Sequence, residues 1–162
     1  MTTLQAQPLT AENFANYGHV IQSQADSGSQ MNGTFARFDD LALIDSAESQ
    51  SPTISIVRSQ IPAALPYVFD LVECHPLCTQ AFIPLSQFEF FVVVAPAGLS
   101  VEMTDLKAFR TNGKQGISYH RGTWHMPLIA TAPNQEFLVI DQANRAGNLR
   151  EQRFDLSVTL AA

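Results

Sequence analysis

The chain has 162 residues, of which 46% are hydrophobic and 15% are charged, a composition typical of one globular domain spanning residues 1–162. Its formal net charge of −6 argues against nucleic acid or a membrane surface as a partner, because both attract clustered lysines and arginines. Two cysteines are too few for a secreted disulfide framework, and no signal peptide pattern is present, so we expect a cytoplasmic protein.

The first element expected along the chain is a short helix within "PLTAENFANYGHV". Thr10 has the position of an N-cap residue, Glu12 lies in the first turn, and Gly18 is expected to end the helix. His19 follows this stop and is expected at the surface. The next segment, residues 23–36, is rich in Ser, Gly and Asn and is expected to be a loop.

The rest of the chain is rich in β-branched and aromatic residues, separated by Pro, Gly and Asn. Strands are expected at residues 53–61, 67–75, 79–85, 87–95, 116–129, 135–141 and 154–160. A helical turn is expected within 100–113, and 141–152 is expected to be a loop. Many short strands favour a β-barrel or a jelly-roll sandwich, which alternation does not distinguish. A parallel α/β fold is disfavoured because helices between the strands are missing.

Polar residues interrupt the apolar strand pattern of "LVECHPLCTQAFIPL". Alternation places Phe69, Glu73 and His75 on one face. These polar groups either lie at a strand end that faces water, or form the polar mouth of a barrel that binds a ligand. The second segment "GISYHRGTWHMPL" adds His120 and His125, so three of the four histidines fall in two short segments. This concentration of histidines favours a ligand site over a strand end that faces water.

The spacing of these residues resembles the two motifs of cupin barrels. In cupins, a His-x-His pair is followed after three or four residues by Glu, and a later motif is Gly-x-x-His. Here Glu73-x-His75 is followed after four residues by Gln80, and Gly122 begins the segment that ends at His125. The resemblance implies that Glu73, His75, Gln80 and His125 hold a divalent cation, although two of the four positions depart from the cupin pattern.

Longer segments are similar, in order, to those of the ureidoglycolate lyase family, formerly called ureidoglycolate hydrolase. They are "NGTFARFDDLAL", "ECHPLCTQAFIPL", "FEFFVVVAP", "LKAFRTNGKQGISYHRGTWHMPL" and "FLVID", which together span residues 32–141. Cys74 stands where members often have arginine, and Met126 where a second histidine is frequent. The resemblance implies a cupin-like (jelly-roll) barrel with a short N-terminal helix.

The same resemblance implies a homodimeric, cytoplasmic enzyme of allantoin breakdown that splits (S)-ureidoglycolate into glyoxylate and urea. It also implies a divalent metal, usually nickel, and no organic cofactor. Two alternatives stay open: a hydrolase that releases ammonia and carbon dioxide from the same substrate, and a non-catalytic module that binds a small carboxylate.

Cleavage of the C–N bond requires a base for the hydroxyl proton and an acid for the departing urea nitrogen. Glu73, His75 and His125 are the catalytic candidates, since carboxylate and imidazole groups suit both transfers. Gln80 can exchange hydrogen bonds with the ureido group. Trp124, beside His125, either packs in the core or forms a wall of the pocket.

The substrate's carboxylate calls for an arginine. Arg37 and Arg58 are the two basic residues of the N-terminal half. Arg58 shares a strand face with Ile54 and Ile56, and this apolar face favours an inward position, although an outward charge on an alternating strand is the alternative. Arg37 can bind the carboxylate or pair with the neighbouring Asp39.

Overall fold

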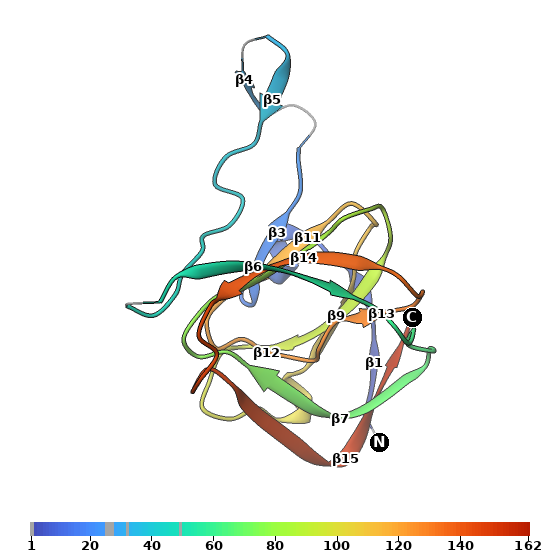
Figure 1. Cartoon of the computed structure of the whole chain (residues 1–162). Helices are drawn as coiled ribbons and strands as arrows, with labels where there is room; N and C mark the ends of the chain where they lie inside the picture. The colour runs from blue at the N-terminus through green and yellow to red at the C-terminus, as the bar shows by residue number, and fades with distance from the viewer. Residues whose placement is uncertain (1, 25–27, 32, 49) are drawn as a thin grey trace.

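The computed structural model describes residues 2–24, 28–31, 33–48 and 50–162, and these are mainly in strands (Figure 1). The strands are β1 (Thr2–Gln5), β2 (Gln7–Pro8), β3 (Gly18–Ile21), β4 (Ser29–Met31), β5 (Phe35–Arg37), β6 (Pro52–Arg58), β7 (Tyr67–Cys74), β8 (Gln80–Pro84), β9 (Phe90–Ala95), β10 (Lys107–Arg110), β11 (Gly116–Tyr119), β12 (Trp124–His125), β13 (Ile129–Ala130), β14 (Glu136–Gln142) and β15 (Arg150–Ala161). The helices are α1 (Ala11–Phe14) and the 3₁₀ helix η1 (Met103–Asp105).

Two sheets face each other and form a nearly closed barrel (Figure 1). One has the order β1-β15-β7-β12-β9-β10-β2, with β13 paired to β9, and the other has the order β3-β11-β8-β14-β6. The pairs β1–β15 and β10–β2 are parallel, and the other pairs within the two sheets are antiparallel. The prediction of a mainly β, barrel-like fold is therefore confirmed. None of the described helices is long and apolar enough to cross a membrane.

The central strand β9 is buried on both faces and separates two hydrophobic clusters. Phe90 and Val92 pack with Phe137 of β14. Because β14 belongs to the opposite sheet, this first cluster fills the interior of the barrel. Phe91 and Val93 belong to the second cluster, on the other face of the same strand. We call the first the interior cluster and the second the outer cluster, and residues on neighbouring strands are assigned to one or the other.

Strand β7 departs from simple alternation. Phe69 packs in the outer cluster together with Val72 and Cys74, not on the face of Glu73 as the alternation predicts. Beside this part of β7 the pairing with β15 is irregular: Leu71 pairs with Arg153 and Phe69 with Val158, so the extra residues lie in β15.

The N-terminal helix begins as predicted but ends earlier. The hydroxyl oxygen of Thr10 accepts a hydrogen bond from the backbone N–H of Asn13 at 3.1 Å, and the side-chain oxygen of Asn13 accepts one from the backbone N–H of Thr10 at 2.9 Å. The helix ends at Phe14, so the prediction that Gly18 ends it is wrong. Gly18 instead begins β3, where a Cβ would lie 2.0 Å from the backbone oxygen of Ser118. The glycine permits this close strand pairing.

Several expected segments are subdivided. The range 116–129 contains three short strands, β11 to β13, and 100–113 contains β10 as well as the predicted helical turn η1. The expected loop 23–36 contains the hairpin of β4 and β5, which projects from the barrel (Figure 1), while its residues 25–27 and 32 lie outside the described part. The last strand, β15, starts before the range expected for it.

Candidate active site

The pairing of β7 with β12 brings the two histidine-containing segments together. Glu73 lies directly opposite His125 in this antiparallel pair, and His75 follows the end of β7. Oε1 of Glu73 lies 3.6 Å from Nε2 of His125 and 3.8 Å from Nε2 of His75. The two imidazole rings are 5.2 Å apart between centroids. Three residues that the sequence selects as catalytic candidates are thus close neighbours.

Backbone carbonyls fix the orientation of both imidazoles. Nδ1 of His75 donates to the carbonyl of Asn148 at 2.7 Å, and Nδ1 of His125 donates to the carbonyl of Thr123 at 2.9 Å. Because a carbonyl oxygen only accepts, each neutral ring carries its proton on Nδ1 and a lone pair on Nε2. Both Nε2 atoms are buried without a hydrogen-bond partner and face Glu73.

The electrostatics of this cluster favour an ionised carboxylate on Glu73 beside a neutral His75 ring. Contact with the His125 side chain lowers the pKa of Glu73, against the opposite effect of burial. Burial lowers the pKa of His75, while its hydrogen bond to Asn148 and the charges of Glu73 and Asp141 act in the opposite direction. At neutral pH these shifts favour an ionised Glu73 beside a neutral His75.

This donor set fits a divalent cation. One ligand atom each from Glu73, His75 and His125 lie within 4.8 Å of one another. Two imidazole nitrogens and a carboxylate oxygen are ligands that first-row transition metals accept. The distances from the carboxylate to the two Nε2 atoms exceed hydrogen-bond length, and neither Nε2 has a protein partner. Gln80 lines the same cavity as Glu73 and His75.

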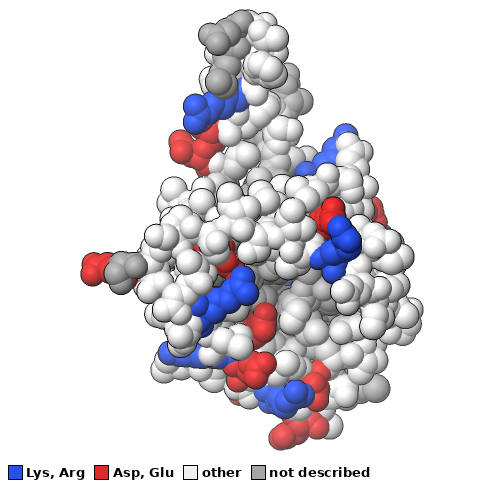
Figure 2. Space-filling model, in the orientation of Figure 1, with Lys and Arg blue, Asp and Glu red and all other residues white. Residues whose placement is uncertain are grey.

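The cluster opens on a cavity of about 330 Å³ inside the barrel. Ser55, Val57, Phe82 and Val139 form its wall on the five-stranded sheet, and Glu73 and His75 lie on the other. Figure 2 shows this face of the molecule hollowed between β6 and β7, with acidic and basic atoms close to the hollow. A cavity of this size suits a small molecule.

The arginines predicted to bind a carboxylate lie elsewhere. Arg58 is on the outer face of β6, where Nε donates to Oε1 of Glu136 at 2.8 Å, and Ile56 on the same face is 60% exposed. The apolar face of β6 therefore points outward, and the inference that it faces the site is corrected. Arg37 pairs with Asp39 at 2.7 Å in the projecting segment. Neither arginine lines the cavity.

Trp124 also lies away from the cavity. It is on the opposite face of β12 from His125, packs in the outer cluster, and donates its indole N–H to the carbonyl of Gly98. The interpretation of Trp124 as a pocket wall is corrected to core packing. Tyr119 instead stacks on His125, with ring centroids 4.4 Å apart and planes 17° apart. His120 points elsewhere, towards the carbonyl of Ala15, which directly follows α1.

The sequence analysis missed the polar residues that the end of β14 and the following loop contribute to the cavity: Asp141, Arg145 and Asn148. Asn148 holds the loop that contains it against the site, because its side chain accepts from the backbone N–H of Leu77 at 2.7 Å and donates to Sγ of Cys78. The available signal was a polar run, "DQANRAGN", directly after a buried strand. Such a run does not show which side chains turn inward.

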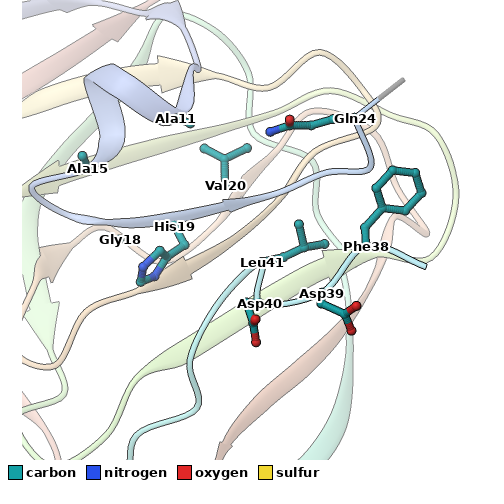
Figure 3. Close-up of a pocket in the computed structure, with 10 residues that line it drawn as sticks. All are labelled: Ala11, Ala15, Gly18, His19, Val20, Gln24, Phe38, Asp39, Asp40 and Leu41. Atoms are coloured by element: carbon teal, nitrogen blue, oxygen red, sulfur yellow. The ribbon is translucent and has the colours of Figure 1, made fainter. Parts of the chain in front are cut away.

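A larger cavity of about 500 Å³ lies outside the barrel interior, between α1, β3 and residues 38–41 (Figure 3). His19, Asp39 and Asp40 line it, but Figure 3 shows their side chains spread apart instead of converging. The smaller cavity is the better candidate because its ionisable groups face one another.

A nearly closed β-barrel with a cavity lined by a carboxylate and an imidazole, next to a second and buried imidazole, defines a protein suited to bind a small molecule and to carry out acid–base or metal-assisted chemistry. Comparison with known proteins identifies it further. The chain belongs to the ureidoglycolate lyase family, which it matches over residues 1–161.

Three relatives named ureidoglycolate lyase illustrate the similarity. The protein of Burkholderia mallei (strain NCTC 10229) is 43% identical over 99% of this chain and 94% of its own length. That of Stutzerimonas stutzeri (strain A1501) is 39% identical over 95% of this chain and 91% of its own. That of Pseudomonas putida (strain F1) is 38% identical over 95% and 93%. A solved structure of a dTDP sugar isomerase from Desulfovibrio desulfuricans G20 aligns with TM-score 0.45 and 18% identity, covering 86% of this chain and 83% of that one.

Proposed function

We propose that the protein is a ureidoglycolate lyase, which cleaves (S)-ureidoglycolate into glyoxylate and urea. Family membership over the whole chain supports the substrate. The observation that carries the chemistry is the position of Glu73 between the unpartnered Nε2 atoms of His75 and His125.

The reaction moves one proton within the substrate. The carbinol hydroxyl loses its proton as the C=O bond of glyoxylate forms, and the urea nitrogen gains a proton as the C–N bond breaks. Glu73, ionised by its lowered pKa, takes the hydroxyl proton. The adjacent Nε2 lone pairs of His75 and His125 then hold it and return it to the leaving nitrogen. The cluster acts as a relay, so no net proton is consumed.

We also propose that Glu73, His75 and His125, with Gln80 as a fourth ligand, hold a divalent cation. Nickel is the ion that family resemblance suggests. When bound, such an ion supplies Lewis-acid stabilisation of negative charge on a substrate oxygen. The same Nε2 atoms cannot bind a metal and carry a proton simultaneously, so with an ion bound the proton transfer would fall to the carboxylate oxygen of Glu73 that does not bind the ion.

The test measures urea, glyoxylate and ammonia released from ureidoglycolate by purified protein, before and after chelation, with nickel, manganese and zinc restored separately. Urea and glyoxylate in equal amounts are expected. Ammonia in place of urea would establish the hydrolase alternative. Binding of glyoxylate with decay of ureidoglycolate at its spontaneous rate would establish a non-catalytic module. The variant Glu73→Gln keeps the shape of the side chain and should lose most activity.

We propose in addition a cytoplasmic homodimer of single-domain chains. The support is the exposed apolar side chains of Ile54 and Ile56 on the outer face of β6, 68% and 60% exposed, and of Phe35 on the separate projecting hairpin, 67% exposed. Both cysteines are free, as expected in a reducing compartment. Light scattering should give twice the chain mass, and Ile56→Lys should yield the monomer mass. One cooperative unfolding transition of that monomer would support a single domain.

A further inference from the structure

One wall of the cavity carries a buried carboxylate that the proposed relay does not use. Asp141, at the end of β14, is 7% exposed and lines the cavity. Its Oδ1 is buried without a hydrogen-bond partner. An unpartnered buried acceptor destabilises the fold, and such atoms are rare without a function. Oδ1 is therefore available for an N–H group that enters the cavity.

Arg145 lies next to this carboxylate. Its Nη2 is 3.4 Å from Oδ2 of Asp141, and it is the basic side chain among the residues that line the cavity. The side chain is 67% exposed, so the guanidinium keeps donors free at the mouth. The backbone beneath it is held in place, because the N–H of Asn148 donates to the carbonyl of Arg145 at 3.1 Å and Asn148 is itself anchored beside His75.

The pair matches two substituents of the proposed substrate. In ureidoglycolate, the carbinol carbon carries the carboxylate, the ureido nitrogen and the hydroxyl, so the first two lie side by side. We propose that Arg145 binds the carboxylate and that Oδ1 of Asp141 accepts the N–H of the ureido group. This inference rests on the proposed function. It leaves the hydroxyl for Glu73 and the two histidines.

The opposite polarity of the pair explains how it distinguishes this substrate from other small acids. Arg145 attracts any carboxylate, whereas Asp141 repels an anion and accepts only from a donor. A ligand that lacks the N–H leaves Oδ1 unpartnered and is bound less tightly. The pair therefore selects a carboxylate with a nitrogen donor on the adjacent carbon.

The chain contains a matched control pair. Arg153 of β15 donates from Nη1 to Oδ1 of Asp70 of β7 at 3.1 Å, and its side chain is 69% exposed. This pair resembles Arg145 and Asp141 in residue types and in exposure of the arginine, but it does not line the cavity. The variants Arg153→Gln and Asp70→Asn should leave ligand binding and KM unchanged.

The experiment titrates the protein calorimetrically with N-carbamoylglycine, which has the carboxylate and ureido groups but no hydroxyl, and with glycolate, which has no ureido group. Arg145→Gln should weaken both ligands by similar factors, roughly ten- to a hundred-fold. Asp141→Asn should weaken N-carbamoylglycine by a similar factor and glycolate much less. In turnover, both variants should raise KM for ureidoglycolate more than they lower kcat.

Three results would overturn the proposal: equal binding of the two probes by the unmodified protein, unchanged binding of both by Arg145→Gln, or equal weakening of both by Asp141→Asn. These outcomes are separate from a failure of the proposed function. If the unmodified protein releases no urea, the lyase assignment fails. If urea release is normal but Arg145→Gln has an unchanged KM, the lyase stands and only the pair is wrong.

Discussion

Replacing His125 by alanine tests the placement of the site most directly. Among the three clustered side chains, His125 alone comes from the second segment. Its loss therefore tests whether both segments contribute to one site. The variant removes an Nε2 that faces Glu73 at 3.6 Å. We expect turnover to fall by roughly 10²–10⁴-fold, the range typical of a lost acid–base group. Loss of a bound metal ion would enlarge the effect.

The same change also costs stability. His125 is 2% exposed, so its side chain contributes to packing as well as to the site. Alanine removes the stacking on Tyr119, worth about 0.5–1.5 kcal/mol, and the hydrogen bond to the Thr123 carbonyl, worth about 0.5–1.5 kcal/mol. The free energy of unfolding should therefore fall by about 1–3 kcal/mol. Activity has to be measured well below the new unfolding temperature.

His120→Ala is the control, since it deletes an imidazole from the same segment. His120 loses a bond of 3.1 Å to the carbonyl of Ala15 and an edge contact with His19, but it does not reach the cavity. The assay is urea release under saturating and limiting substrate, with unfolding followed by circular dichroism. Equal, small losses of turnover in the two variants, or a larger loss in His120→Ala, would refute the placement of the site.

Three further outcomes follow from the fold. Trp124→Phe removes an indole hydrogen bond in the outer cluster, so calorimetric stability should fall by about 1–3 kcal/mol while kcat/KM stays unchanged. Gly18→Ala places a Cβ against the backbone oxygen of Ser118, and the denaturation midpoint should drop by the equivalent of about 1–3 kcal/mol or more. Burial and the adjacent His120 lower the pKa of His19, so the unfolded chain binds its proton more readily and stability decreases as pH falls below about 6.5. His19→Gln should make the free energy of unfolding less dependent on pH in that range, and an unchanged slope would contradict this.

The sequence predicts much of the site because its two halves lie on regular strands. Alternation places Glu73 and His75 on one face, and cross-strand pairing then brings His125 opposite. Alternation does not say which face is inward. On β6 the apolar face that carries Arg58 is exposed, while Ser55 of the other face lines the cavity. An apolar face that no part of the described chain covers cannot be distinguished from a core face by sequence pattern alone.

The loop residues of the cavity were beyond prediction for a different reason. Asp141 ends a strand, but Arg145 and Asn148 lie where the backbone has no fixed period, so their side-chain directions depend on long-range contacts. The bond from Asn148 to Cys78 joins positions 70 residues apart. Trp124, in contrast, follows the alternation rule, because a neighbour of His125 on a strand must face the opposite side.

The backbone bonds of the two histidines have a consequence for how the site tolerates change. Where a histidine is oriented by a carboxylate side chain, a single substitution elsewhere in the chain can flip its tautomer. Here both Nδ1 protons are held by peptide oxygens, which every amino acid supplies. A substitution at residue 123 or 148 therefore keeps the acceptor itself, although at 148 it removes the side-chain bonds to Leu77 and Cys78 that hold the loop in place. Mutations that change the tautomers are expected to act by moving the backbone. A survey of homologous sequences should find no side chain that replaces the backbone carbonyl as the acceptor of either Nδ1 proton.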